Sequence, residues 1–362
     1  MKIFLIVGAR PNFVKLAPLY KTFKKEKSFI IKIVHTGQHY DYELDRVFFE
    51  DFEIPQPDYY LNVGSDSHAR QTAKIMIKLD ELFDEDKPDW IFVFGDVNST
   101  VSASLTAIKR NIKIAHVEAG LRSFDMSMPE EINRILTDRI SHLHFVSEPS
   151  GVQNLIREGV NLKSIHLVGN IMIESLIEGL KKIENRFDKL SNEFSISEKS
   201  FALLTLHRPS NVDNIEKLRK ILDIVSEIAK SIKIIFPAHP RTLNNLKELN
   251  FKSFKNFIIT KPLRYLDFIT LMKFSAFVMT DSGGIQEETT YLKIPCLTLR
   301  ENTERPITIE KGTNVLVGDS REKILKFFNE IMEGKFKKGE DIPLWDDKVS
   351  QRILSIFLTQ LL

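Results

Sequence analysis

Three acidic residues stand at places in this chain where a carboxylate needs a partner or a purpose. Asp96 comes just after the apolar run WIFVF, Glu118 follows IKIAHV, and Glu130 lies in PEEINR after a short loop. Taken singly, Asp96 suits a turn and Glu130 suits a helix start. Acids that converge from consecutive strand ends more often mark proton transfer. Together, the three predict general acid–base chemistry.

The segment PEEINR also predicts an ion pair. Pro129 followed by Glu130 and Glu131 is typical of the first turn of a helix, where the helix dipole favours acids. Arg134 follows within ion-pair reach of either acid. We assign Glu131 to this helix start, paired with Arg134, and keep Glu130 as a candidate for proton transfer.

The segment TDSGGIQEE predicts a second kind of site, a helix start that binds a phosphate group. Because Gly283 and Gly284 carry no Cβ, the backbone N–H groups next to Ser282 can approach an anion closely. A carboxylate about one turn later, Glu287 or Glu288, could take both hydroxyls of a ribose. The spacing therefore suits a nucleoside diphosphate.

Basic residues follow several other expected strands. Arg10 and Lys15 lie in GARPNFVK after the first run, where a phosphate contact and plain surface charge are about equally favoured. His207 in LHRPSN and His239 in AHPRT each have an arginine nearby. Such pairs at two strand ends favour an anion site or an acid–base pair. Arg305, in RENTERP, adds a cation after a later run.

Several classes of function are disfavoured. No G-x-G-x-x-G follows the first run, which argues against a nicotinamide enzyme, and no CxxC or HxxxH spacing indicates a metal site. The net charge of +2 gives no bulk attraction to nucleic acid or acidic membranes. The lone Cys296 lies in an apolar run and is expected in a core, which fits a reducing cytoplasm. No segment has the roughly 18 apolar residues of a membrane helix.

The elements that must position these residues alternate along the chain. Short apolar runs without polar alternation predict parallel strands covered by helices on both faces. The chain of 362 residues suits about two domains. We expect an α/β fold of two Rossmann-like domains facing across a cleft, residues 1–170 and 171–345, with a helix over 346–362 packing back on the first. The expected strands are 2–7, 30–35, 90–94, 112–117, 143–147, 201–206, 232–238, 256–260, 276–280, 294–299 and 314–318.

With these motifs in this order, the chain resembles the non-hydrolysing UDP-N-acetylglucosamine 2-epimerases, which share the GT-B architecture. The resemblance runs from Met1 to about Gly318. It is carried by GARPNFVKLAPL, HTGQHYD, FGDVNST, HVEAGLRS, PEEINR, LHRPSN and TDSGGIQEE.

The resemblance implies interconversion of UDP-GlcNAc and UDP-ManNAc through loss of UDP to a glycal and its re-addition. It implies a soluble cytoplasmic homodimer that serves cell-surface polysaccharide biosynthesis and needs no metal, nicotinamide, nucleic acid or membrane. The implied catalytic residues are Asp96, Glu118, Glu130, His207 and Lys15. The expected UDP-sugar contacts are Arg10, Arg134, His239, Ser282, Gly283, Gly284, Glu288 and Arg305.

Departures from the family pattern leave alternatives open. Asn12 and Phe13 replace the usual acid of GTRPE, which we place near the sugar, so a related UDP-diacetamido uronic acid is an alternative substrate. A GT-B glycosyltransferase and a non-enzymatic nucleotide-sugar sensor are less favoured. Tyr40 follows Gln38 and His39 where some members carry an arginine of an activating second substrate site, so that site stays open. Which carboxylate serves which sugar face also stays open.

Overall fold

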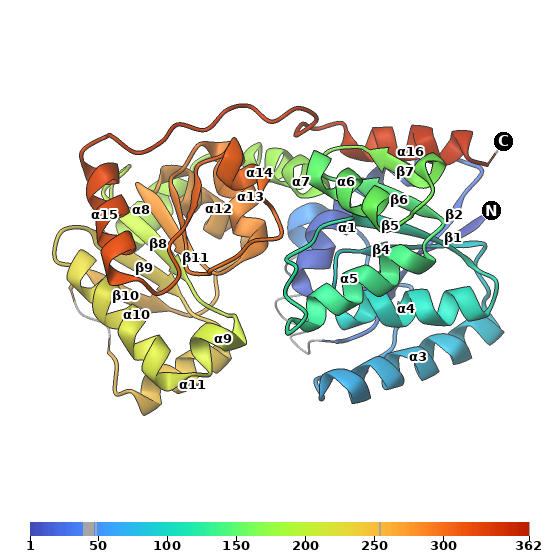
Figure 1. Ribbon diagram of the computed structural model, residues 1–362, viewed down its shortest axis with the longest axis horizontal. Coiled ribbons are helices and arrows are strands. Elements are labelled where there is room, and N and C mark those ends of the chain that lie inside the picture. Colours follow the sequence, from blue (N-terminus) through green and yellow to red (C-terminus); the bar gives the residue numbers. More distant parts are fainter. Residues whose placement is uncertain (39–46, 48, 253–254, 362) are drawn as a thin grey trace. The chain divides into compact units, whose positions relative to one another are not determined.

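The computed structural model describes residues 1–38, 47, 49–252 and 255–361 of the chain (Figure 1). The chain divides into two compact units, Met1–Ile177 with Pro343–Leu362, and Glu178–Ile342. The sequence predicts these divisions at 170/171 and 345/346. The first division lies later because helix α7 (Ile171–Leu180) begins as part of the first unit.

The first unit is built on a parallel sheet of seven strands in the order β3-β2-β1-β4-β5-β6-β7. Its strands are β1 (Lys2–Val7), β2 (Ile30–His35), β3 (Tyr59–Tyr60), β4 (Trp90–Phe94), β5 (Lys113–Ala119), β6 (Leu143–Val146) and β7 (Ile165–Leu167). The five expected strands of this half are confirmed. We missed β3 and β7, which form the two edges and are too short to give an apolar run.

Helices cover both faces of this sheet (Figure 1). They are α1 (Arg10–Phe23), α3 (His68–Glu85), α4 (Asn98–Lys109), α5 (Pro129–Ile140), α6 (Pro149–Arg157), the start of α7, and α16 (Val349–Thr359). On one face, Ile75 of α3 joins Phe4 in a buried cluster. On the other, the Phe357 ring of α16 stacks on Phe23 with centroids 5.8 Å apart and meets Phe92 edge-on. Double coverage explains why the strands lack polar alternation.

The C-terminal segment is fixed to the first unit by polar contacts as well as by aromatic packing. The N–H and Oγ of Ser350 donate to the carboxylate of Glu174 at 2.7 and 2.6 Å. The Nε1 of Trp345 donates to the carbonyl of Ser147, and the Nε of Arg352 to that of Val168. These contacts tie α16 and the chain before it to β6, α7 and the end of β7.

Gly169 is where this segment passes closest to the sheet, which gives a stability prediction. Its φ is +90°, and a Cβ there would lie 2.0 Å from the carbonyl oxygen of Leu344. We expect Gly169→Ala to lower the free energy of unfolding by roughly 2–5 kcal/mol, from left-handed backbone strain and overpacking. Gly64→Ala is the matched control, because Gly64 has φ +76° and open space around its Cβ position. Urea unfolding would compare them, and equal losses would contradict the role given to Leu344.

The second unit has a parallel sheet of six strands in the order β10-β9-β8-β11-β12-β13. Its strands are β8 (Phe201–Thr205), β9 (Lys233–Pro237), β10 (Phe257–Thr260), β11 (Phe277–Thr280), β12 (Cys296–Thr298) and β13 (Asn314–Leu316). All six expected strands are confirmed, with ends shifted by one or two residues. The helices are α8 (Arg186–Phe194), α9 (Pro209–Val212), α10 (Ile215–Ile228), α11 (Pro240–Glu248), α12 (Tyr265–Phe274), α13 (Gly283–Leu292), α14 (Ile307–Glu310) and α15 (Arg321–Met332).

The second unit also contains the segment 178–200 and the single cysteine. The polar segment 178–200 contains α8, whose Leu190 and Phe194 are buried in the core with Leu203. Cys296 is fully buried as expected, and burial raises the pKa of its thiol to about 11. In the described part of the chain no helix is long and apolar enough to span a bilayer.

Candidate active site

The acidic edge of the first unit is the strand-end region that carries Asp96, Glu118 and Glu130. It contains an ion pair between Lys15 of α1 and Glu118 of β5. Their side chains are 5% and 6% exposed, and Lys15 Nζ contacts Glu118 Oε2. Glu118 has a φ of +73°, and the pairing of β5 with β6 is irregular between Val117 and Ala119. A bulge of this kind redirects a side chain, and backbone strain of this kind gathers at functional sites. The backbone strain at Glu118 therefore suggests that the position of its side chain matters for function.

Gly95 makes room for this pair. It follows β4, its φ is +62°, and a Cβ at this position would lie 2.7 Å from Lys15 Nζ and 4.0 Å from Glu118 Oε2. No residue with a side chain could hold this turn and keep the lysine in place. The glycine of FGDVNST thus serves the Lys15–Glu118 pair.

Asp96, the next residue, is held by Arg134 of α5. The Nε and Nη2 of Arg134 contact Asp96 Oδ2 at 2.9 and 2.8 Å. Asn133 donates from Nδ2 to the Asp96 carbonyl at 2.9 Å. The Asp96 side chain is 23% exposed while that of Arg134 is 2% exposed. Arg134 thus fixes the orientation of the Asp96 carboxylate, which stays open to one side.

The two acids of PEEINR have different roles. Glu131 is buried, pairs with Arg134, and accepts hydrogen bonds from the N–H groups of Ser123 and Phe124 at 2.9 Å each. The prediction that Glu131 pairs with Arg134 is confirmed, and the acid also closes the loop before α5. Glu130 is half-buried, and its side chain makes no hydrogen bond or ion pair with any residue the structure describes. Glu130 is therefore available to a ligand.

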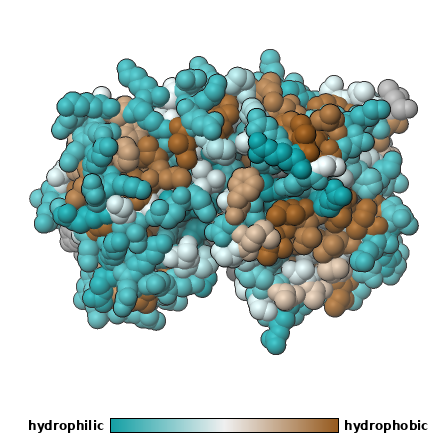
Figure 2. Space-filling model, viewed as in Figure 1, coloured by the Kyte–Doolittle hydropathy of each residue, from teal (hydrophilic) through white to brown (hydrophobic). Residues whose placement is uncertain are grey.

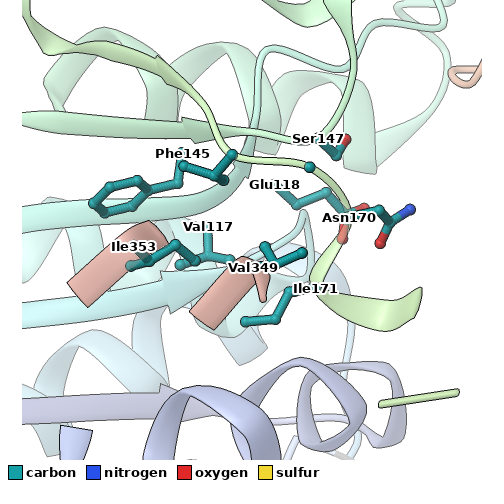
Figure 3. A pocket seen from close by; sticks show the side chains of 10 residues that line it. Val117, Glu118, Phe145, Ser147, Asn170, Ile171, Val349 and Ile353 are labelled. Carbon is teal, nitrogen blue, oxygen red and sulfur yellow. The ribbon is translucent and has the colours of Figure 1, made fainter. Parts of the chain in front are cut away.

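Glu118 also lines a narrow crevice at the ends of β5 to β7 (Figure 3). Ser147 and Asn170 line this crevice, and Ser147 Oγ and Asn170 Nδ2 are each buried without a hydrogen-bond partner among the described residues. Asn170 is fixed because its Oδ1 accepts from the N–H of Met172 at 2.9 Å. The remaining wall is apolar and includes Val349 of α16. The crevice surrounds Glu118 with low-dielectric material.

A buried network lies behind this edge, and sequence reasoning missed it. His116 of β5 is fully buried, with Nδ1 2.6 Å from Asp138 Oδ1 and Nε2 2.8 Å from the carbonyl of Gly95. Burial would raise the pKa of Asp138, but His116 and Arg122 outweigh it and hold that pKa below its ordinary value. Arg122 in turn makes a bidentate contact with Glu158.

In the second unit, α13 begins at an arginine–carboxylate cluster. A Cβ on Gly283 would lie 2.4 Å from Nη1 of Arg305 and 2.7 Å from Oε1 of Glu304. Arg305 is buried and contacts Glu304 at 2.5 Å and Glu287 at 2.9 Å. The guanidinium thus lies directly against the backbone of the helix start, as an anion site requires.

Two further arginines meet Glu304. Nη2 of Arg300 lies 2.8 Å and Nη2 of Arg208 lies 3.5 Å from its carboxylate. Nε of Arg208 and Nη1 of Arg300 are buried and have no acceptor within the described residues. Unsatisfied buried guanidinium donors are costly unless a ligand completes them. They suit the oxygens of a phosphate.

The two glutamates of α13 separate by role. Glu287 is fully buried and pairs with Arg305, whereas Oε1 of Glu288 accepts a 2.8 Å hydrogen bond from the hydroxyl of Tyr265. Sequence reasoning left the two glutamates open as ribose ligands and did not find Tyr265, which lies on another helix. The pairing of Glu287 leaves Glu288 as the stronger candidate.

His207 is oriented by a buried carboxylate. Its Nδ1 lies 2.9 Å from Oδ1 of Asp281, and its side chain is 49% exposed. Asp281 is fully buried and accepts from the N–H groups of His207 and Arg208 and from Nδ2 of Asn211. Burial alone would raise the pKa of Asp281, but the interactions with His207, Arg208 and Asn211 outweigh it and lower that pKa. The first acid of TDSGG was the signal for this partner.

The buried Asp281 predicts acid sensitivity. An Asp with a lowered folded pKa stabilises the fold above its unfolded pKa of about 3.9, and that contribution is lost as pH falls from there. Asp281→Asn is expected to lower the free energy of unfolding by about 3–5 kcal/mol at neutral pH. The difference from wild type should shrink below about pH 4. Urea unfolding at both pH values tests this, and a constant difference would contradict it.

The remaining expected site residues have other placements. His239 is exposed and caps α11, with Nδ1 3.4 Å from the N–H of Arg241, while Arg241 pairs with Asp213. Arg10 begins α1, but its side chain lies outside the described structure, as do His39 and Tyr40. No group of three His, Cys, Asp or Glu in the described residues could hold a metal.

Asn12 and Phe13 are both buried at the start of α1. Asn12 is buried, with Oδ1 accepting from the N–H groups of Gly8 and Ala9 and Nδ2 donating to the carbonyl of Phe94. Phe13 is also fully buried. Asn12 therefore joins the ends of β1 and β4, and its departure from the family pattern has a structural explanation.

Two doubly wound parallel sheets, with charged clusters at their strand ends, are typical of the GT-B class of α/β proteins. The family model for UDP-N-acetylglucosamine 2-epimerase matches residues 21–358, and the chain belongs to this family.

Similar proteins agree with this placement. The chain is 47% identical over 328 residues to a Methanococcus maripaludis protein named UDP-N-acetylglucosamine 2-epimerase homolog, covering 90% of this chain and 91% of that one. The crystal structure of Methanocaldococcus jannaschii UDP-GlcNAc 2-epimerase in complex with UDP-GlcNAc and UDP matches with a TM-score of 0.92 and 43% identity, covering 99% and 100%. UDP-2,3-diacetamido-2,3-dideoxy-D-glucuronate 2-epimerase of Pseudomonas aeruginosa is 37% identical, covering 90% and 91%.

Proposed function

We propose that the protein is a non-hydrolysing UDP-N-acetylglucosamine 2-epimerase that interconverts UDP-GlcNAc and UDP-ManNAc. The observation that carries this proposal is the buried Lys15–Glu118 pair beside an oriented Asp96. Inverting a carbon needs proton-handling groups on both faces of the sugar, which a cluster of carboxylates supplies. Relatives with this activity in their names cover nearly the whole chain.

The reaction follows from the chemistry of C2. A carboxylate takes the C2 proton, the C2–H electrons form a C1=C2 double bond, and the C1–O bond breaks so that its electrons leave on UDP. The resulting glycal then accepts a proton at C2 from the other face, and UDP adds back at C1. The C2 proton is weakly acidic, so its removal and the loss of UDP must develop together.

The first unit supplies the proton-handling groups. Glu118, Asp96 and Glu130 are the candidate acids and bases, and Lys15 keeps a cation against Glu118. The apolar wall around Glu118 strengthens these interactions because they act in a low dielectric. Arg134 acts by holding Asp96.

The second unit supplies groups suited to the leaving UDP. N–H groups at the start of α13, next to Ser282, Gly283 and Gly284, and the Arg305 guanidinium would stabilise charge that develops on the diphosphate. His207, oriented by Asp281, would donate to a diphosphate oxygen. Glu288 would bind the ribose. His239 and Arg10 remain proposed substrate contacts.

The substrate alternative is a UDP-diacetamido uronic acid, which is supported by the Pseudomonas aeruginosa relative. Asn12, whose departure from the family pattern suggested this alternative, is buried and joins the ends of β1 and β4. Relatives named for UDP-GlcNAc reach higher identity, 47% and 43% against 37%. UDP-GlcNAc is therefore the substrate we favour.

One experiment tests reaction type and substrate together. UDP-GlcNAc, UDP-ManNAc and UDP-diacetamidoglucuronic acid are each incubated with the protein in D2O and followed by NMR. We expect deuterium at C2 and a mixture of epimers from the first two sugars. Exchange with the uronic acid alone would establish the alternative. Binding of all three sugars without exchange at C2 would favour a sensor. Transfer of the sugar to an added acceptor, again without exchange, would favour a glycosyltransferase.

We also propose a cytoplasmic homodimer that supplies sugars for cell-surface polysaccharides. Apolar side chains gather on the surface over α5 (Figure 2), where Phe124, Met126, Ile132 and Leu136 are 75%, 62%, 41% and 43% exposed. Patches of this kind mark association surfaces. Light scattering should give a dimer mass that Leu136→Glu reduces. A monomeric wild type would contradict the dimer.

A further inference from the structure

His116 lies in the layer directly behind the acidic edge. Its ring is fully buried in β5, two residues before Glu118. Both ring nitrogens face oxygen acceptors at hydrogen-bond distance, Asp138 Oδ1 at 2.6 Å and the Gly95 carbonyl at 2.8 Å. A carbonyl can only accept, so Nε2 must carry a proton toward Gly95.

The second nitrogen faces the carboxylate of Asp138, whose pKa is held below its ordinary value. Oδ2 of Asp138 contacts Nη1 of Arg122 at 2.7 Å and accepts from the N–H of Gly120 at 3.1 Å. With these donors on Oδ2, Oδ1 is left to accept from His116. Oxygen acceptors therefore face both ring nitrogens, an arrangement that two ring N–H donors would satisfy.

The carbonyl held by His116 belongs to the turn that the proposed chemistry needs. Gly95 has the left-handed φ that makes room for Lys15 Nζ, and its N–H donates to the carbonyl of Val117 at 3.0 Å. The next residue is Asp96. A rotation of the Gly95 peptide would move Asp96 and would press on the Lys15–Glu118 pair.

We infer that His116 is a positioning residue: as an imidazolium bridging Asp138 and the Gly95 carbonyl, it fixes the turn that places Asp96 and Lys15. The inference rests on the proposed epimerase function for its effect on turnover. Its structural part, the doubly protonated ring, stands independently of that function. His116 touches no substrate and acts through Gly95.

The neighbouring strand offers a matched control. His144 of β6 pairs in register with His116, is also buried, and its Nε2 contacts the Asp138 backbone carbonyl at 2.7 Å. It belongs to the same layer and contacts the same aspartate, but no contact joins it to Gly95 among the described residues. His144→Gln therefore reports the cost of losing a buried histidine here.

The test combines NMR of the ring with kinetics. In wild type with 15N-labelled histidine, both His116 nitrogens should be protonated at neutral pH. His116→Gln should lower kcat for epimerisation about 100-fold, the size of loss that a small misplacement causes, with KM and UDP affinity changed less than about threefold. His144→Gln should keep kcat within about threefold of wild type.

Each other outcome counts against the inference. An unprotonated His116 nitrogen in wild type overturns the imidazolium, and this holds even if His116→Gln does not fold. Equal losses of kcat in the two variants show a general packing role, and an unchanged kcat in His116→Gln removes the positioning role. If wild type exchanges no C2 proton on any UDP-sugar, the proposed function fails, while the NMR result still decides the state of the ring.

Discussion

Replacing Glu118 with glutamine is expected to lower kcat for epimerisation by about 10²- to 10⁴-fold, the range that a positioned acid or base contributes. Glutamine keeps the shape of the side chain but neither takes nor gives a proton at the sugar. Among the three candidate acids, Glu118 is the one whose position requires an unusual backbone conformation, with a φ of +73° in a β-strand. NMR of C2 deuterium incorporation measures the loss directly.

The control for Glu118→Gln removes the charge of Lys15, which loses its ion-pair partner in the single variant. The side chain of Lys15 is 5% exposed, so the single variant buries an unpaired charge and should be less stable by about 3–5 kcal/mol. The double variant with Lys15→Met removes both charges and should regain much of that stability without regaining turnover. A Glu118→Gln protein that keeps more than about a tenth of wild-type kcat would exclude Glu118 as a proton-handling group.

Much of the fold followed from the sequence because both sheets are covered on both faces. Strands such as β1 and β4 are continuous apolar runs, and helices between them carry the polar faces. The strands that escaped, β3 and β7, lie at sheet edges and span two and three residues. Too few buried residues mark them. Likewise, α8 lies in a polar stretch of sequence because only one face of it is buried.

The candidate site divides in the same way. Residues that we propose to contact a ligand stand at strand ends, where a charged residue after an apolar run is visible in sequence. Residues that act behind them are hidden, because their partners come from distant elements. Asp138 of α5 meets His116 across 22 positions of sequence, and Tyr265 of α12 meets Glu288 across 23. Asn12 shows the converse, because a departure that suggested sugar specificity serves to join two strands.

Gly283→Ala is expected to weaken UDP binding about 10- to 100-fold. A Cβ at this position would lie 2.4 Å from Nη1 of Arg305 and 2.7 Å from Oε1 of Glu304, so the guanidinium would have to leave the helix start. A hydrogen bond to a charged group contributes about 1.5–3 kcal/mol, and each 1.4 kcal/mol is about tenfold in affinity.

A loss of UDP affinity in Gly283→Ala would point to the start of α13, not to a general disturbance of the second unit. Arg305 contacts Glu287 at 2.9 Å and Glu304 at 2.5 Å, so a displaced guanidinium would also unbalance two buried carboxylates. Gly334→Ala is the control, because it lies in the same unit with open space at its Cβ position. It should leave UDP affinity unchanged in calorimetric titrations. Gly283→Ala binding UDP as tightly as Gly334→Ala would contradict a diphosphate site at this helix start.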